Sequence, residues 1–588
     1  MTDTTTTGRR TLVRPELRKE LALTVALVLG ISIYPLVAGS LYWGQITMLA
    51  NLYLVATVGL NILRSEAGQM SFGHGAVFGS AAYATAMAAG IAELPFAAAA
   101  VVGFLTGLAV GVLLALPSLR VQGYYLGFVT MAGALAFPQL LFVFEEQTHA
   151  LTGISVPVPG LNEIAFWRVS WLTLVIVLLA LASVVGYAVI RSSRLGRQMR
   201  VVGASPEAAV TLGLHPGRLR MLAFAIASAI TALAGVLYIP LIQYVAPGSF
   251  TIALSVLLYF IVVIGGPGTI LGPLVGVGLL YVLPNAVLAD VGEYRLLIYG
   301  GIAFVVMFLL PEGVVGSVHA LIARLRRRDV GGSVSLGPVL AAASEASRRE
   351  HETTAGEVVL SAENLSRSFG SVKALDDVSF TVRSAQIHGI VGPNGSGKTT
   401  LLNSLSGLIR LDRGTVVLHG QDMSSAGPVQ RARRGMARTF QAPRLFGDLS
   451  VWENIDVGRR SAGGWLDAGL ADVRAQWDAT PGDVLPHAQQ RFLEVIRVLR
   501  QDPSIVVLDE PAAGLSQSER QEFGRLLRSV VEATGAAVVI VEHDLELVWQ
   551  IADQISVVDA GQVRLTGTPQ ELRHHADINH LFAGVQHA

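Results

Sequence analysis

Long apolar stretches dominate the first half of the chain and predict membrane-spanning helices. About ten such stretches, each of roughly the 17 to 25 residues that cross about 30 Å of hydrocarbon, lie near 20–40, 45–64, 73–92, 95–117, 122–144, 170–190, 219–240, 251–266, 269–289 and 295–311. The segment from Gly265 to Gly272 fits either a turn between two spans or a break within a re-entrant pair. We therefore predict a multi-pass α-helical membrane domain that includes broken helices.

The second half of the chain has a different pattern. Short runs such as VVLSAENLSRSF, VSFTVR and IHGIVG predict strands, and helical and strand patterns then alternate to the end. This alternation indicates an α/β domain. Between the halves, from Asp329 to about Gly356, the chain is rich in Gly, Ser, Ala and charge without sustained periodicity. We place the membrane domain at 1–322, a flexible linker at 323–356 and the α/β domain at 357–588.

The composition also indicates a membrane protein. Of the 588 residues, 52% are hydrophobic and only 15% are charged, which is far too apolar for an ordinary soluble protein. The 43 basic residues balance the 43 acidic ones, so no chain-wide basic field points to a nucleic-acid partner. The absence of cysteine excludes disulfides, thiolate metal sites and cysteine catalysis. No cleavage pattern clearly follows the first apolar run, which we interpret as a retained helix rather than a signal peptide.

Basic residues between the apolar stretches predict the orientation in the membrane, because cytoplasmic loops collect Lys and Arg. With the N-terminus inside and an even number of spans, the inner side holds Arg9, Arg10, Arg14, Arg18, Lys19, Arg64, Arg120, Arg191, Arg194, Arg197, Arg200, Arg218, Arg220, Arg324, Arg326, Arg327 and Arg328, and the outer side holds Arg168 and Arg295. We expect a cell-membrane protein with a cytoplasmic N-terminus and α/β domain. The cluster from Arg324 to Arg328 is interpreted as an anchor beside anionic lipid, not a nucleic-acid site.

A phosphate-binding loop follows an apolar strand in the α/β domain. The run GPNGSGKTT matches the pattern of glycine, four residues, glycine, lysine and Ser/Thr. Glycines are needed because the backbone must curl closely round the phosphates at the positive end of the next helix. We predict that ATP binds here, with Lys398 at the β and γ phosphates and Thr399 on Mg²⁺. The expected contacts are Gly392, Asn394, Gly395, Gly397, Lys398, Thr399 and Thr400. A purely structural glycine turn is the alternative.

Two carboxylates end a later apolar run. The four aliphatic residues before Asp509 predict a buried strand, and Glu510 follows directly. We predict that Asp509 holds magnesium through water and that Glu510 polarises the attacking water as general base. Paired acids after a strand are common by chance, but the upstream lysine loop disfavours chance here.

From about Val358 to Leu581 the chain resembles the ATP-binding-cassette (ABC) ATPases. The resemblance implies that Gln441, in ARTFQAPRLF, helps to bind magnesium, senses the attacking water and relays to a permease. It also implies that His543, in VIVEHDLELV, contacts the γ phosphate and that Phe369 stacks on adenine. A lone histidine at a strand end is more often structural, but its place in this order of motifs favours a functional role.

The family signature, approximately Leu-Ser-Gly-Gly-Gln, is degraded. This chain has Leu485, Pro486, His487, Ala488 and Gln489 there. Pro486 offers neither a hydroxyl nor an amide hydrogen, and Ala488 adds a methyl group where glycine normally lies against phosphate. The stretch after Gln441 is shorter than we expect in relatives, so we predict a trimmed helical subdomain. AAGLS, Ala512 to Ser516, resembles the dimer-contact loop but ends in serine where an acidic or amide residue is frequent.

The longest intracellular loop contains a punctuated short helix, GASPEAAVTLGLHPG. Ser205 suits the N-cap, Pro206 the first helical position, Glu207 the first turn, and Gly213 the C-terminal end. Ala208, Ala209 and Leu212 form a small apolar face. The segment Glu207, Ala208, Ala209 and Gly213 resembles the coupling helix of binding-protein-dependent importers, which docks beside the glutamine loop. A surface helix on the membrane is the alternative.

The first 320 or so residues resemble the membrane subunits of the branched-chain amino-acid transporter family. The segments that carry the resemblance are Val58 to Tyr83, Ser118 to Ala132, Pro240 to Phe250, Val262 to Pro273 and Tyr294 to Gly316. RTFQAPRLF and VEHDLELV likewise resemble the matching ATPase subunit. The resemblance is specific to the family and not to the substrate.

Polar residues lie among glycines between Gly68 and Gly79, inside an apolar region. Gln69, Ser71 and His74 are the candidates for a translocation pathway, because unwound backbone at membrane depth must face protein or a cavity. The alternative is a tight helix-packing site with His74 bonded to a neighbour.

Together these features predict an ATP-driven importer with fused permease and ATPase domains. The expected substrate is a branched-chain or related hydrophobic amino acid delivered by an extracytoplasmic binding protein, with urea, short amides or aromatic acids as alternatives. A non-hydrolysing regulatory cassette is the alternative of another class. A fused exporter half would lack the Glu-Ala-Ala loop. The expected partners are a second permease, a second ABC ATPase with an intact signature, and the binding protein.

Overall fold

The computed structural model describes residues 15–121, 123–158, 164–166, 169–287, 295–326, 334, 337–347, 356–459, 465–543, 545–573 and 575. The predictions for Arg9, Arg10, Arg14, Arg168, Arg327 and Arg328, and for parts of the expected linker, lie outside these residues. The chain divides into two compact units, one formed by residues 1–204 and 216–329 and the other by residues 205–215 and 330–588. The loop 205–215, which was predicted to be intracellular, thus groups with the C-terminal unit.

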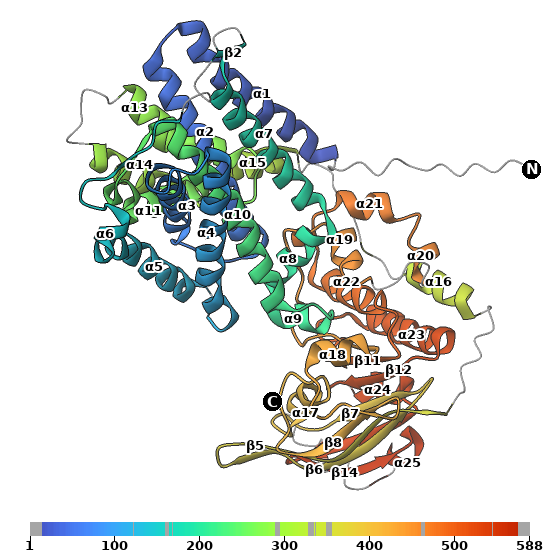
Figure 1. Ribbon diagram of the computed structural model, residues 1–588. Helices are drawn as coiled ribbons and strands as arrows, with labels where there is room; N and C mark the ends of the chain where they lie inside the picture. The colour runs from blue at the N-terminus through green and yellow to red at the C-terminus, as the bar shows by residue number, and fades with distance from the viewer. Residues whose placement is uncertain are drawn as a thin grey trace, which may run out of the picture. The chain divides into compact units, whose positions relative to one another are not determined.

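The first unit consists mainly of helices (Figure 1). They are α1 (Pro15–Ala38), α2 (Leu41–Asn61), η1 (Ile62–Glu66), α3 (His74–Ala86), η2 (Met87–Ile91), α4 (Phe96–Ala115), η3 (Leu116–Leu119), α5 (Tyr124–Val143), α6 (Glu145–Thr148), α7 (Trp171–Ser192), α8 (Arg194–Ala204), α10 (Pro216–Ile242), η4 (Pro247–Phe250), α11 (Ile252–Gly265), α12 (Gly272–Val277), η5 (Gly278–Val282), α13 (Leu283–Val287), α14 (Arg295–Leu309) and α15 (Gly313–Arg326). Short antiparallel pairs join β1 (Ile154–Ser155) to β4 (Tyr244–Val245) and β2 (Ile164–Phe166) to β3 (Val169–Ser170).

Seven stretches among the described residues are long and apolar enough to cross a membrane. They are Leu41–Glu66, Phe96–Leu119, Tyr124–Val143, Trp171–Ser192, Pro216–Ile242, Pro247–Gly265 and Phe304–Ile322. Three more predicted stretches are largely helical in their described residues: 20–40 in α1, 73–92 in α3 and η2, and 269–289 from α12 to α13. The multi-pass helical domain is therefore confirmed, although seven qualifying stretches are fewer than the about ten predicted from apolar length.

The predicted break near Gly265 is a turn between two helices. α11 ends at Gly265, and α12 begins at Gly272. The backbone amides of Ile270 and Leu271 donate to Oε1 of Glu20 at 2.7 and 3.0 Å. A carboxylate from α1 thus satisfies backbone groups that the broken helix leaves without intrahelical partners.

The second unit is an α/β domain with two sheets. The larger sheet has the order β10 (Met436–Arg438), β11 (Ile505–Asp509), β12 (Ala537–Val541), β7 (Ile387–Val391), β13 (Gln554–Asp559) and β14 (Gln562–Gly567), and the smaller has the order β6 (Val372–Arg383), β5 (Val358–Phe369), β8 (Arg413–Leu418) and β9 (Gln421–Asp422). Only the β13–β14 pair of the larger sheet is antiparallel. Every residue of β7, β11 and β12 is buried, as their unbroken apolar sequences predict for central parallel strands.

The helices of this unit are α9 (Pro206–Thr211), α16 (Gly337–Ser347), α17 (Lys398–Leu405), α18 (Pro428–Arg433), α19 (Val451–Asp456), α20 (Leu466–Gly469), α21 (Arg474–Ala479), η7 (Gly482–Val484), α22 (His487–Leu499), α23 (Gln517–Thr534), α24 (Leu545–Ile551) and α25 (Pro569–Arg573). α23 shows why such a sequence forms a helix. Ser516 and Glu519 form a capping box at its start, and Gly535, at a φ of 68°, ends it in the left-handed region.

Part of the expected flexible linker is helical. α16 packs against α20 and α23, and Val339, Ala342 and Ala343 on it are buried. A Cβ atom on Gly469 of α20 would lie 2.2 Å from Cβ of Ala342, so the two helices are in close contact. The sequence gives no sign of this helix because the buried residues are small, and the helix is stabilised by tertiary packing rather than by a strong amphipathic pattern.

Candidate functional site

The phosphate-binding loop joins β7 to α17. Gly397 has a φ of 102°, and a Cβ atom there would lie 2.3 Å from the Ala374 carbonyl oxygen. A Cβ atom on Gly392 would lie 2.0 Å from the Val558 carbonyl oxygen. Glycine is therefore required at both positions.

The lysine of this loop is folded over its own backbone. Lys398 Nζ donates to the carbonyl oxygens of Gly392 and Pro393, both at 2.8 Å. Burial lowers the pKa of Lys398, while Glu510 and Asp509 act in the opposite direction. Asn394, Gly395 and Thr399 are exposed, and Thr400 is half-buried. The loop thus presents backbone amides and a hydroxyl to the surface at the N-terminus of α17, which suits an anionic ligand.

Asp509 ends β11 and is buried, with 2% of its surface exposed. Its Oδ2 accepts from Nη2 of Arg438 at 3.4 Å, whereas Oδ1 has no hydrogen-bond partner among the described residues. Burial raises the pKa of Asp509, and Arg438 opposes that shift. An unsatisfied buried carboxylate oxygen beside a phosphate loop fits a hydrated cation.

Glu510 brings together the three residues predicted to be catalytic. Its Oε2 accepts from Nε2 of Gln441 at 3.0 Å, and its Oε1 lies 2.7 Å from Nε2 of His543. Glu510 also has a φ of 46°, which is uncommon for a residue with a side chain and is typical of strained functional positions. Residues from the ends of β11 and β12 and from the segment after β10 therefore meet at one carboxylate.

The signature helix α22 holds the segment that follows Gln441. Arg491 donates to the carbonyl oxygens of Phe440, at 3.1 Å, and of Gln441. Arg497 donates to the carbonyl oxygen of Arg444 at 2.8 Å. The backbone position of Gln441 thus depends on side chains of α22.

The short helix α9 is capped as the sequence predicts. The Ser205 hydroxyl accepts from the Ala208 amide at 3.2 Å, and Gly213 has a φ of 77°. The Leu214 amide donates to the Ala209 carbonyl oxygen at 3.0 Å, which closes the C-terminal end. Ala208 and Ala209 are buried, and α9 contacts α18. The predicted apolar face is therefore packed against the α/β domain.

One residue of this contact was not predicted from the sequence. Nη2 of Arg444 lies 2.6 Å from Oε2 of Glu207, and Nη1 donates to the Ser205 hydroxyl at 3.3 Å. The guanidinium also lies 4.9 Å from the centre of the Phe440 ring. Arg444 follows Gln441 by three positions, inside a motif that the sequence had already singled out. Its charge opposite the lone acidic residue of the α9 sequence was the available signal.

The degraded signature lies at the start of α22. Pro486 occupies the N-cap position without a side-chain hydrogen bond and is exposed, whereas Leu485 is buried. His487 and Ala488 begin the helix. Gln489 Oε1 accepts from the backbone amide of Val334 at 3.1 Å, so a described residue of the expected linker binds the signature glutamine.

The remaining predicted ATP contact, Phe369, ends β5 and is 46% exposed. The guanidinium of Arg367 lies 4.8 Å from the centre of its ring. Stacking on one side by a cation leaves an exposed aromatic ring that suits a second planar group. Ser516, at the end of the predicted dimer-contact loop, caps α23.

In the membrane unit, the backbone between η1, which ends at Glu66, and α3, which begins at His74, is not helical. Gln69, Ser71 and His74 are buried. His74 Nδ1 lies 3.0 Å from Oγ of Ser71, so the histidine is bonded to a neighbour. A Cβ atom on Gly75 would lie 2.2 Å from Oγ of Ser255, which indicates close packing against α11. The break and the tight packing site therefore occur together.

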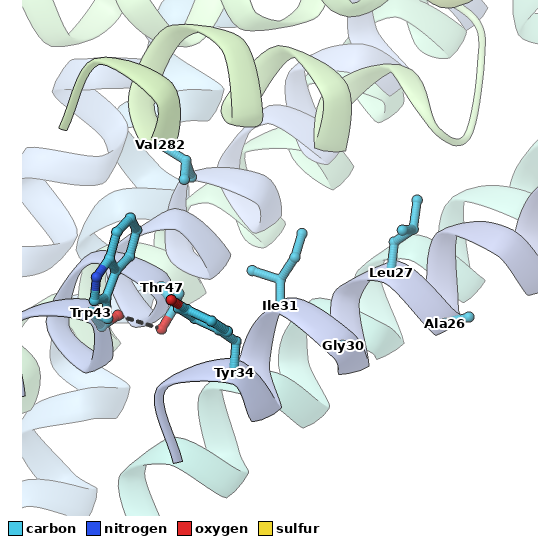
Figure 2. A pocket seen from close by; sticks show the side chains of 8 residues that line it. All are labelled: Ala26, Leu27, Gly30, Ile31, Tyr34, Trp43, Thr47 and Val282. Carbon is cyan, nitrogen blue, oxygen red and sulfur yellow. Dashed lines mark hydrogen bonds between the residues drawn. The ribbon is translucent and has the colours of Figure 1, made fainter. Parts of the chain in front are cut away.

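A separate pocket of about 380 Å³ lies in the membrane unit (Figure 2). It is lined by Ala26, Leu27, Gly30, Ile31, Tyr34, Trp43, Thr47 and Val282. The Thr47 hydroxyl donates to the Trp43 carbonyl oxygen at 2.8 Å. None of these lining residues was predicted to form the translocation path.

Comparisons with known proteins support both halves. The family model described as "Branched-chain amino acid transport system / permease component" matches residues 42–310, and that described as "ABC transporter" matches residues 375–513. The high-affinity branched-chain amino acid transport ATP-binding protein LivG of Salmonella typhimurium is 34% identical over 253 residues, covering 38% of this chain and 98% of LivG. BraF of Pseudomonas aeruginosa, of the same description, is 31% identical over 253 residues, with the same coverage.

A crystal structure of an ATP-binding cassette of an ABC transporter in its ADP conformation is 27% identical, covers 39% of this chain and 99% of the cassette, and has a TM-score of 0.35. The membrane unit with its apolar helices matches the permease component, and the C-terminal unit aligns with nearly the full length of LivG. The chain belongs to the ABC transporters of the branched-chain amino-acid type, and it joins a permease domain to a nucleotide-binding domain that hydrolyses ATP to drive transport.

Proposed function

We propose that this protein imports a branched-chain or related hydrophobic amino acid that an extracytoplasmic binding protein delivers. The observation that carries the proposal is the docking of α9 on the cassette through Glu207 and Arg444. This contact resembles the way in which binding-protein-dependent importers transmit movement between domains. The printed description of LivG as a high-affinity branched-chain amino acid transport protein supports the substrate class.

In the proposed hydrolysis step, Lys398 leaves its two carbonyl partners and binds the β and γ phosphates. Glu510 orients the attacking water and accepts its proton. His543 contacts the γ phosphate. Gln441 contacts the attacking water and keeps its hydrogen bond to Glu510. The exposed ring of Phe369 stacks on adenine.

The residues present also fit Mg²⁺. The orphaned Oδ1 of Asp509 suits a water on the ion, and the Thr399 hydroxyl and the Gln441 side-chain oxygen provide the hard oxygen ligands that magnesium prefers. When bound, magnesium neutralises charge on the phosphates. Asp509 supplies its oxygen from the end of β11, Thr399 from the start of α17 and Gln441 from the segment after β10.

The degraded signature supports pairing with a different ATPase. Each nucleotide in this family lies between the lysine loop of one cassette and the signature of the other, so a homodimer would place Pro486 and Ala488 against both nucleotides. We propose instead that a partner ATPase with an intact signature completes the site of Lys398 and Glu510. A second permease completes the pathway. The cassette and the N-terminus then lie in the cytoplasm.

ATP-dependent uptake of labelled leucine in proteoliposomes tests the proposal. The chain is purified with the products of neighbouring reading frames, and the matched control carries E510Q. We expect leucine uptake that valine and isoleucine inhibit and that E510Q abolishes. Uptake of urea, acetamide or an aromatic acid without leucine uptake would overturn the substrate assignment. Two equivalent hydrolysing sites in a fully active homodimer would overturn the proposed pairing.

A further inference from the structure

Glu66 is a fully buried carboxylate at the end of η1, where the apolar stretch Leu41–Glu66 gives way to the break before α3. Its Oε1 accepts from Nη1 of Arg191 at 2.8 Å and from the Tyr187 hydroxyl at 3.3 Å, both on α7. Its Oε2 lies 3.4 Å from Nε of Arg200 on α8, whose side chain is 4% exposed. Three segments of the membrane unit therefore meet at one carboxylate.

Burial of these charges is unfavourable unless they stay paired. Separation of Glu66 from Arg200 would take the carboxylate away from the buried Arg200 guanidinium, although Glu66 would keep its bond to Arg191. The two positions therefore move together, or the pair opens as a discrete event. η1 is also a π-helical segment, and such irregular turns are frequent at functional sites. The ion pair thus joins an irregular helix end to α8.

The backbone shows a second contact between the same segments. Gly68 has a φ of 64°, and a Cβ atom on it would lie 2.9 Å from Cα of Gly203. A Cβ atom on Gly203 would in turn lie 2.9 Å from the Gly68 amide nitrogen. Gly203 and Arg200 lie one turn apart on α8, on the same face of that helix. Backbone contact and ion pair therefore hold the same edge of the break.

The two ends of this connection lead to different parts of the protein. From Gly68 the chain enters the break that holds the buried Gln69 and Ser71. From Gly203 the chain passes through Ala204 directly to Ser205, the N-cap of α9. α8 and α9 are therefore joined by the single residue Ser205.

We propose that Glu66 and Arg200 form a latch that couples the position of α9 to the conformation of the break at residues 67–73. Closure of the cassettes displaces α9 and α8, the Glu66–Arg200 pair opens, and the break is released. Glu66 and Arg200 are positioning residues and contact neither ATP nor the transported solute in this proposal. The latch rests on the proposed function, because the proposed function assigns α9 the role of coupling segment.

The test uses the absence of native cysteine. M70C places a single thiol of this chain at a half-buried position in the break. In the assembled transporter carrying E510Q, so that ATP stays bound, the rate of maleimide labelling at position 70 is measured with and without ATP. We expect ATP to change the rate about fivefold or more, the usual size of coupling between two sites. E66Q should reduce that change to less than about twofold, with binding of a fluorescent ATP analogue unaltered.

E20Q is the matched control. Glu20 also accepts hydrogen bonds from backbone amides at an interruption between helices of the membrane unit, but it contacts neither Arg191 nor Arg200 in any described interaction. E20Q should keep the full ATP response. If E66Q fails to reach the membrane, R200Q removes the same pair and leaves the Glu66–Arg191 bond in place. An undiminished ATP response in either variant overturns the latch, as does an absent response in the M70C parent or an equal loss in E20Q. Because labelling needs no transported solute, failure of leucine uptake with an intact labelling response would contradict the proposed substrate and not the latch.

Discussion

The two faces of the cassette that the proposed dimer would place against nucleotide differ sharply. On the lysine-loop face, Gln441 and His543 both bond to Glu510, and Asp509 keeps an unsatisfied oxygen. On the signature face, Pro486 caps α22 without a side-chain hydrogen bond, and Gln489 is bonded to Val334. The first face retains the groups that we propose for hydrolysis, whereas the second has proline where the family signature has serine.

In the proposed dimer, one half of each shared nucleotide site therefore contributes to catalysis and the other to closure. In the proposed mechanism the carboxylate of Glu510, directly after β11, acts on the reacting water, so no other group replaces it after its loss. In the same proposal the signature contributes binding energy to the closed state, and the positive end of α22 still offers part of it. A partner cassette is able to replace the second contribution and not the first.

The largest effect is expected from E510Q, which tests the lysine-loop face. Loss of the general base should reduce ATP turnover by roughly 10²- to 10⁴-fold, with ATP binding nearly unchanged because the phosphate loop stays intact. Phosphate release and nucleotide binding by the purified transporter measure the two quantities. Undiminished turnover in E510Q would refute the assignment of the base.

The next test restores the family's residues on the signature face. P486S with A488G restores a hydroxyl and removes a methyl group, and each charge-assisted hydrogen bond to phosphate is worth about 1.5 to 3 kcal/mol. We expect about a tenfold tighter ATP-closed state, measured as ATP-induced cassette closure by cross-linking or scattering. P486A is the control, because it restores the amide hydrogen without the hydroxyl. Equal closure by the repaired and original proteins would mean that this signature does not face nucleotide.

G213V tests whether the cassette drives transport through α9. Gly213 has a φ of 77°, and a side chain in this left-handed region costs about 1 to 2 kcal/mol, so the end of α9 should distort. Solute uptake should fall by about tenfold, with ATP binding retained. G186V provides the control, since a Cβ atom on Gly186 meets no atom within 4 Å. Normal uptake by G213V would give this loop another role.

A342L tests α16, the linker helix that packs against α20 and α23. Ala342 is buried against Gly469, whereas Ala341 is exposed. Overpacking should destabilise the cassette by about 1 to 3 kcal/mol and lower its melting temperature. A341L adds the same volume to the exposed side of α16 and should have little effect. Identical melting temperatures for the two variants would show that α16 does not stabilise the cassette.

The smallest effect is expected from a histidine beneath the lysine loop. Burial lowers the pKa of His388 on β7 from its usual value of 6.5 to about 4. The unfolded chain therefore binds more protons between these two values, and cassette stability should fall as pH decreases through this window. The free energy of unfolding of the cassette should fall between pH 7 and pH 5.5, and H388Q should make that fall about 1 kcal/mol smaller. Thermal unfolding at the two pH values measures the difference. H419Q, at an exposed histidine, is the control; an equal change there would contradict the assignment to His388.

Motifs with fixed local geometry were predictable from the sequence. The glycines at 392 and 397, the cap at Ser205 and the turn at Gly213 all depend on backbone conformation over a few residues. The buried strands β7 and β11 were also predictable, because their apolar runs fit only a sheet covered on both faces. The count of membrane spans was not predictable, since the length of an apolar stretch alone does not separate a broken helix from two spans.

The sequence by itself determined the two classes of domain, the phosphate loop and the local form of α9. Only the tertiary structure placed Glu66 beside Arg200, Glu207 beside Arg444, and α16 against Gly469. The physical reason is the range of the interactions. Turns, caps and strand burial arise from neighbours in the chain, whereas an ion pair or a contact between small residues requires segments that are far apart in sequence, and no local pattern specifies which partner each will meet.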